Sequence, residues 1–197
     1  MRNQLKLAAQ YAGFGVVYHP RLYWPVRDAF HWLSRAGAVE GNYNGAAVGE
    51  AHEEFGLDMA PMQRAMLARK RRASERDTSH RRRVVSRYRD ALGPCEQSSF
   101  PEPAGADVVY ARLPLRVEDK RGLLEAARRA GVELAEWYSS PIHPLEGQAL
   151  DAIGYRRGSC PVAESRCAHV VSLPTHRRVG TAFVERAAAL LRERGLR

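Results

Sequence analysis

Three polar side chains in the last third of the sequence are candidate ligand-binding residues. His143 lies between Ile142 and Pro144, in a stretch rigid enough to aim a side chain, and Tyr155 and Glu164 follow it along the chain. Each also has a plainer interpretation. The histidine can be exposed or bonded to backbone, the tyrosine and the glutamate can simply anchor the loop, and a glutamate suits the positive end of a helix.

The cysteines indicate neither a metal site nor a disulfide framework. Cys95, Cys160 and Cys167 are an odd number, and no two of them form a C-x-x-C pair, so we expect free thiols in a reducing compartment. No apolar run approaches the roughly 20 residues that cross a bilayer, and the basic N-terminus is not followed by the apolar core of a signal peptide. We therefore expect a cytoplasmic protein with no metal site and no membrane span.

The positive charge of the chain is concentrated in one segment. Of the formal net charge of +9, a net +8 lies between Met62 and Leu92, which hold eleven basic and three acidic residues. Arginine outnumbers lysine 28 to 3, and coding bias explains this as readily as phosphate binding does. Three interpretations stay open: a solvated helix with weak ion pairs, a contact with an acidic partner or a diphosphate, and nucleic acid. Nucleic acid comes last, because no helix-turn-helix, zinc module or stacking-aromatic surface accompanies the charge.

The elements that would position the candidate residues are clearest beyond residue 94. Apolar and β-branched runs predict strands over 108–115, 132–138 and 170–174, with Pro114 marking a strand edge or end. Helical spacing predicts helices over 118–130 and 163–168 and from Thr181, which we expect to be an N-cap. The prediction is an α/β fold: a small C-terminal domain, residues 94–197, of about three mostly antiparallel strands covered by helices.

Upstream of this domain we predict a long basic helix and an irregular arm. Residues 58–93 contain no helix breaker after Pro61, which the first turn tolerates, and Asp58 is the expected N-cap. Gly93 and Pro94 end the helix. Residues 1–57 form the arm or linker, with one short amphipathic helix expected over 26–35.

The segment from Tyr138 onward resembles the end of the DegT/StrS-type sugar aminotransferases, which depend on pyridoxal phosphate. A Pro-x-His loop, a Pro-x-Ala-Glu helix start and a Leu-Ser-Leu-Pro strand occur in those enzymes in this order and at about this spacing. The matching pieces here are Ser140-Pro141-Ile142-His143-Pro144-Leu145, Gly154-Tyr155, Cys160-Pro161-Val162-Ala163-Glu164 and Val170-Val171-Ser172-Leu173-Pro174-Thr175-His176. The resemblance implies the small domain of a fold-type I aminotransferase, in which His143 and Tyr155 would contact a nucleotide-sugar substrate, His143 in the pocket of a neighbouring subunit.

Two departures from the family pattern bear on catalysis. The family's Asn-Tyr-Arg opening of the long helix, which helps to bind the cofactor phosphate, reads Gly56-Leu57-Asp58 here. Relatives attach the cofactor through a lysine in a serine- and glycine-rich loop of a large domain, whereas Lys6, Lys70 and Lys120 lie in no such loop. The resemblance thus implies no catalytic and no cofactor-binding residue in this chain.

These observations lead to two functional hypotheses. The first is a partial or truncated aminotransferase, inactive alone, whose intact relatives transfer an amino group to a keto-sugar nucleotide in polysaccharide biosynthesis; the resemblance also implies a homodimer. The alternative is a non-catalytic binding module that uses the arginine-rich helix against an anionic partner, either nucleic acid or an acidic protein.

Overall fold

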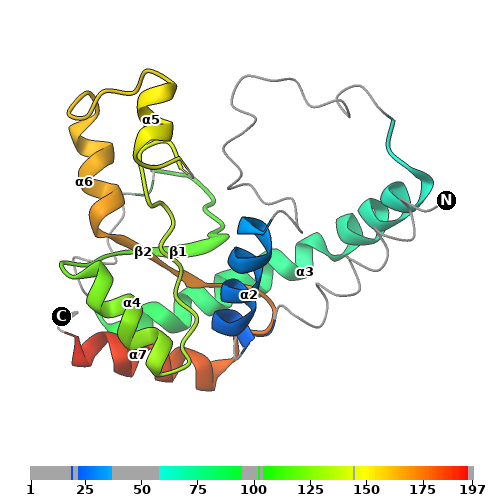
Figure 1. Cartoon of the computed structure of the whole chain (residues 1–197). Coiled ribbons are helices and arrows are strands. Elements are labelled where there is room, and N and C mark those ends of the chain that lie inside the picture. The colour runs from blue at the N-terminus through cyan, green and yellow to red at the C-terminus, as the bar shows by residue number, and fades with distance from the viewer. Residues whose placement is uncertain are drawn as a thin grey trace.

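The structure is a computed structural model, and it describes residues 19, 22–36, 58–94, 102, 104–143 and 145–194. Most of the predicted arm, including the stretches 1–18 and 37–57, lies outside the described residues, as does Cys95. The predicted division of the chain at 57/58 and 93/94 therefore stays a prediction. Figure 1 shows a small sheet with helices packed around it and one long helix that extends away from it.

The short helix expected over 26–35 is present as α2, Tyr23–Arg35. It starts three residues earlier than predicted and contributes to the core through Trp24. The Trp24 indole is buried, and its Nε1 donates to the carbonyl oxygen of Val132 at 2.8 Å. Salt bridges from Arg27 to Glu136 and from Arg128 to Asp28 add polar contacts at its edges. The sequence analysis placed this helix in an irregular arm, but in the structure it packs against residues of the domain that lie more than 100 positions later in the chain.

The long helix is α3, Pro61–Leu92. The expected N-cap, Asp58, is wrong: the cap is Ala60, whose N–H donates to the Gln63 side chain at 2.8 Å. Pro61 at the first helical position needs no partner for its nitrogen, so this cap suffices. Among the described residues of α3, only Val84, Val85 and Tyr88 are buried, all in its last third. The rest of the helix reaches out past α2 (Figure 1).

Two antiparallel strands form the sheet in the described part of the chain. They are β1, Arg112–Arg116, and β2, Val170–Pro174, with Leu113 opposite Leu173 and Leu115 opposite Val171. The β2 prediction is confirmed, whereas β1 is shorter than the run expected over 108–115. Pro114 sits in β1, where a two-stranded sheet makes every strand an edge strand and so tolerates a missing N–H donor.

The third strand predicted over 132–138 is wrong. This segment makes a single antiparallel bridge, between Ala135 and Ser172, with N–O distances of 2.8 and 3.0 Å. Several of its other carbonyl groups accept from side chains instead of from a strand. The Glu136 and Tyr138 carbonyls accept from Lys120, and the Trp137 carbonyl accepts from the Ser172 hydroxyl at 3.4 Å. Because buried carbonyls need only one good donor, the segment is extended without joining the sheet.

Four further helices complete the domain: α4, Lys120–Arg129; α5, Gln148–Ala152; α6, Pro161–His169; and α7, Thr181–Glu193. Asp119 caps α4 by accepting from the Gly122 N–H at 2.8 Å. The expected cap Thr181 is wrong, since Gly180 is the N-cap of α7 and Thr181 is its first helical residue. The short α5 was not predicted at all. The apolar face of α7 packs against the last third of α3 and against α4.

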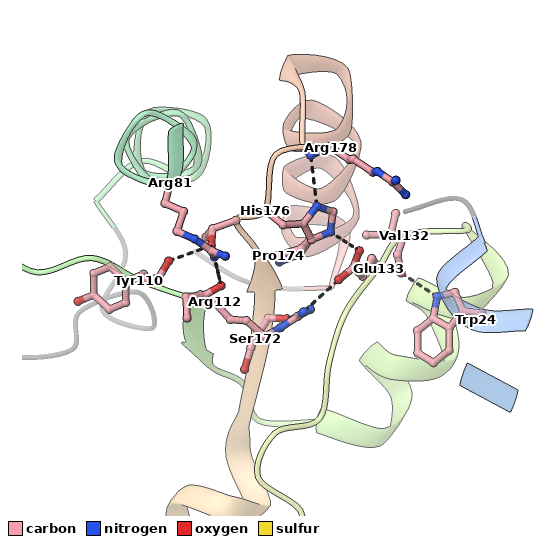
Figure 2. A network of polar contacts seen from close by, with 12 residues as sticks. Trp24, Arg81, Tyr110, Arg112, Val132, Glu133, Ser172, Pro174, His176 and Arg178 are labelled. Carbon is pink, nitrogen blue, oxygen red and sulfur yellow. Dashed lines mark hydrogen bonds and ion pairs between the residues drawn. The ribbon is translucent and has the colours of Figure 1, made fainter. Parts of the chain in front are cut away.

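A buried carboxylate links the sheet to the loop that follows it. Glu133, only 4% exposed, accepts from Arg112 Nη1 at 3.0 Å and from His176 Nε2 at 2.9 Å. The Arg178 N–H donates to His176 Nδ1 at 3.3 Å, so the neutral imidazole carries its proton on Nε2, toward the carboxylate (Figure 2). A carboxylate this buried is tolerated because both of its oxygens have a donor.

The contact of Trp24 with the core makes α2 a determinant of stability. Trp24→Ala should lower the free energy of unfolding by about 3–5 kcal/mol, because it removes a buried ring and leaves the Val132 carbonyl without a donor. Urea unfolding followed by circular dichroism measures this. Trp32→Ala on the same helix is the matched control: that ring is 69% exposed, and its loss should change the stability by less than about 0.5 kcal/mol. Equal effects of the two changes would contradict the role of Trp24.

Candidate functional site

A cavity of about 470 Å³ lies where the loop after Tyr138, helix α5 and helix α6 come together. Its walls include polar side chains from the loops on either side of α5 and from α6, namely Ser139, Ser140, Glu146, Tyr155, Arg157, Glu164 and Cys167, whereas α5 itself contributes Leu150. The set combines hydroxyl, carboxylate and guanidinium groups with few large apolar side chains. Such walls suit a ligand with many hydrogen-bonding groups.

Tyr155 and Glu164 form a bonded pair at this cavity. The Tyr155 hydroxyl donates to Glu164 Oε1 at 2.8 Å, and the Gly158 N–H donates to the same oxygen at 2.7 Å. These two bonds hold the pKa of Glu164 below its ordinary value, and the bond from Tyr155 makes the larger contribution. Desolvation, together with the bond to Glu164, raises the pKa of Tyr155. Glu164 is thus an ionised acceptor held by the 155–158 loop, in addition to its place in the first turn of α6.

Ser140 presents a buried hydroxyl to the same cavity. The residue is 5% exposed, and its Oγ has no hydrogen-bond partner among the described residues. A buried hydroxyl without a partner costs free energy. Because Oγ itself is not exposed to solvent, a ligand in the cavity would bond to it only after a shift of the neighbouring atoms.

His143 lies beside the cavity and not in its wall. Its Nδ1 is 3.0 Å from Ser139 Oγ and 3.4 Å from Ser139 N. Because a backbone N–H can only donate, Nδ1 is the acceptor and the neutral ring carries its proton on Nε2. The Trp137 and Tyr138 rings lie 6.3 and 5.6 Å from the imidazole, centroid to centroid. The structure therefore brings Tyr155 and Glu164 into contact, and places His143 behind Ser139.

A second cavity of about 600 Å³ adjoins the first, and Ser139, Glu146, Cys167 and Ala168 line both. Lys120 is part of its wall. The Lys120 Nζ donates to three carbonyl oxygens, those of Cys167 at 2.7 Å, Tyr138 at 3.0 Å and Glu136 at 3.1 Å. One ammonium group therefore ties the loop that carries Ser139 to the helix that carries Glu164. Burial lowers the pKa of Lys120, and the carboxylate of Glu136 opposes that shift.

Sequence reasoning missed Ser140 and Lys120 as parts of this region. Ser140 lies next to the Pro-x-His motif, and the only local sequence feature that marks it is the pair of serines before Pro141. No such feature marks Lys120, because its three acceptors lie 16, 18 and 47 residues away.

In the described part of the chain no three His, Cys, Asp or Glu side chains are grouped as metal ligands would be. None of the described helices is long and apolar enough to cross a membrane.

Comparison with known proteins relates this arrangement to one family. Residues 27–192 match the DegT/DnrJ/EryC1/StrS aminotransferase family. The match begins within α2 and takes in all of α3 and every residue that lines the first cavity. A search of curated proteins gave no match to the sequence.

Two solved structures are similar to the chain. One is a DegT DnrJ EryC1 StrS aminotransferase from Brucella abortus, which is 27% identical with a TM-score of 0.56 over 68% of this chain and 35% of that one. The other is S. venezuelae DesV in complex with a ketimine intermediate, 22% identical with a TM-score of 0.62 over 86% of this chain and 44% of that one. The second likeness establishes the α/β aminotransferase fold alone. The chain spans less than half of the length of either structure.

The bond between Tyr155 and Glu164 predicts a measurable shift. Tyr155→Phe removes the largest contribution that lowers the pKa of Glu164, so that pKa should rise toward its ordinary value of 4.5. A ¹³C NMR titration of the Glu164 carboxyl measures it. Because the folded-state pKa is depressed, the stabilisation is present above the ordinary pKa and is lost as the pH falls through the folded-state value. The variant should therefore be less stable than wild type only at the higher pH.

Tyr138→Phe is the matched control, since its ring packs against His143 and it should leave the Glu164 titration unchanged. An unchanged Glu164 pKa in Tyr155→Phe would show that the phenol does not donate to the carboxylate in solution.

Proposed function

Because the chain belongs to the DegT/DnrJ/EryC1/StrS aminotransferase family, we propose that its described region forms the small-domain part of a nucleotide-sugar site. Intact relatives would use pyridoxal phosphate to transfer an amino group to a keto-sugar nucleotide. In this chain Tyr155 and His143 would contact that substrate. The chain alone would bind without transferring an amino group.

The observation that carries this proposal is the polar cavity that holds Tyr155, Glu164 and Ser140. A sugar presents hydroxyls that both donate and accept. Glu164 is held as an acceptor, Ser140 Oγ is buried without a described partner, and Arg157 adds a cation in the same wall. His143 lies behind Ser139, which holds its ring through Nδ1. These are the groups that a substrate with several hydroxyls and a diphosphate would require.

The described lysines do not suit covalent attachment of the cofactor. A Schiff base needs a neutral amine with access to the carbonyl carbon, whereas Lys120 directs its ammonium at three backbone carbonyls. Lys70 lies on an exposed stretch of α3, in no loop that could cradle a phosphate. Lys6 lies outside the described residues. We therefore propose that none of the described residues is catalytic.

The proposed partners follow from the family and not from contacts in the structure. A nucleotide sugar is the proposed ligand and a second copy of the chain the proposed subunit partner. A cytoplasmic location is proposed because nucleotide sugars and pyridoxal phosphate are cytoplasmic metabolites.

Mixing the purified chain with pyridoxal phosphate tests the absence of covalent cofactor attachment. We expect no saturable Schiff-base absorbance and no transamination with a nucleotide-sugar substrate, because Lys120 would have to give up three hydrogen bonds to react. Lys120→Met and Lys70→Met variants serve as controls for reaction at individual amines. A saturable absorbance band that either substitution removes would overturn this part of the proposal.

Substrate binding is tested by titrating the chain with a nucleoside-diphosphate sugar and following ¹H–¹⁵N NMR signals. We expect weak, saturable shifts around Ser140 and Tyr155. Tyr155→Phe should weaken binding about tenfold, the effect of one lost hydrogen bond, and His143→Ala should weaken it less, because His143 lies behind Ser139. His169→Ala is the control, since that imidazole bonds to the Ser165 carbonyl on α6 and lines neither cavity. Shifts elsewhere, or equal weakening by the control, would contradict the proposed site.

A further inference from the structure

The arginines of α3 differ in whether they are engaged by the rest of the chain. Arg81 donates to the Ala111 carbonyl at 2.6 Å and to Thr175 Oγ1 at 2.7 Å. Arg82 pairs with Asp107, and Arg89 with Glu102. These three fasten α3 to the segment before β1 and to the end of β2. Their charge is therefore used within the domain.

Five other arginines of α3 lie in one line on its solvent side, and we call them the arginine stripe: Arg69, Arg72, Arg76, Arg83 and Arg87. At 3.6 residues per turn they fall within an arc of about 60° and span about 27 Å of helix axis. All five are exposed. The buried residues Val84, Val85 and Tyr88 occupy the other side of the helix. The stripe therefore faces away from the core along its whole length.

No described residue neutralises the stripe. Its five guanidinium groups make no hydrogen bond and no salt bridge to the part of the chain that the structure describes. Asp77 lies outside the arc and is paired with Arg177. Glu75 lies about 60° outside the arc, and Asp90 lies on the edge of the arc, near the C-terminal end of α3. Five parallel cations on one rigid helix repel one another in the absence of an anion.

We propose that the arginine stripe binds the phosphodiester backbone of nucleic acid. The guanidinium fork matches two oxygens of one phosphate, which a lysine ammonium cannot do. A duplex carries one negative charge per about 1.7 Å of axis, so a strand along the stripe offers a phosphate to each arginine. An α-helix with its side chains is about 10–12 Å wide, close to the width of the major groove of B-DNA.

The surface of the stripe favours nucleic acid over an acidic protein. Protein interfaces have a desolvated apolar or aromatic centre with a polar rim, whereas the only apolar side chain within the arc is Ala65. A hollow of about 540 Å³ beside Arg69, Arg72 and Arg76 has Ala65, Ala68 and Ala73 as its other described walls. Small side chains let a backbone approach the guanidinium groups. Because no group is placed to read base edges, binding should not depend on sequence.

The experiment measures binding of the full chain to two fluorescent probes by anisotropy, from about 50 to about 200 mM salt. One probe is a duplex DNA of about 20 base pairs and the other a single-stranded RNA of equal length. Five phosphate contacts predict a slope of log K against log salt of about −4.5 for the duplex and about −3.5 for the single strand. Binding to both probes would show that the phosphodiester backbone, which they share, is the ligand. A preference for one probe would show which type of nucleic acid the stripe binds.

The test variant is Arg69→Gln/Arg72→Gln/Arg76→Gln, in which glutamine keeps the helix propensity. It should bind at least about tenfold more weakly at low salt, and the steepness of its duplex slope should fall by about 2.7, because three phosphate contacts are lost. The matched control is Arg121→Gln/Arg129→Gln/Arg156→Gln. It removes three exposed arginines that lie outside α3, and its slope should remain that of wild type.

Three outcomes would overturn the proposal. They are no binding of either probe at low salt, an equal loss of affinity in both triple variants, and tighter binding of a polyglutamate peptide than of either nucleic acid. The last outcome would assign the stripe to an acidic protein.

Discussion

The domain depends on how the segment 132–138 satisfies its buried polar groups. It lies beside β2 but bridges to it only at Ala135, so most of its groups need partners from elsewhere. Side chains from α2, β1, α4, β2 and the loop after β2 supply them: Trp24 bonds to the Val132 carbonyl, Arg112 and His176 to the Glu133 carboxylate, Lys120 to the Glu136 and Tyr138 carbonyls, and Ser172 to the Trp137 carbonyl. A buried carbonyl left without a donor costs about 1–3 kcal/mol. This one segment therefore fixes the positions of α2, β1, α4 and β2 together.

The candidate site depends on the same segment. The loop that carries Ser140 and His143 leaves it at Tyr138, where Lys120 bonds to the last carbonyl. The same ammonium bonds to Cys167 in α6, the helix that contributes Glu164. The Lys120 ammonium group therefore holds both walls of the cavity in position relative to each other. A change at Lys120 would alter the distance between Ser140 and Glu164 without touching any ligand, as a positioning residue does.

The sequence predicts the locally determined elements well, and fails where long-range contacts decide. The strand β2 and the helices α6 and α7 are found close to their predicted bounds, because apolar periodicity and a leading proline are local signals. The apolar residues of 132–138 led to the prediction of a strand, but only the neighbours of this segment determine whether a ladder forms. At the site, the motif led to Tyr155 and Glu164, and no local pattern could have revealed the three acceptors of Lys120.

The arginines of α3 are a second case in which the sequence alone is not enough. The number of charged residues gives the net charge of the helix, but it does not say which arginines bond within the chain and which could bind a partner. The structure separates the two: Arg81 bonds to the segment before β1, while Arg72 and Arg76, on the opposite side of the same helix, have no described partner. Helical phase makes this division, since half a turn separates the side that faces the domain from the side that faces the solvent. The stripe and the cavity share no residue. Hence the proposed nucleotide-sugar site and the proposed nucleic-acid contact of α3 rest on separate parts of the chain.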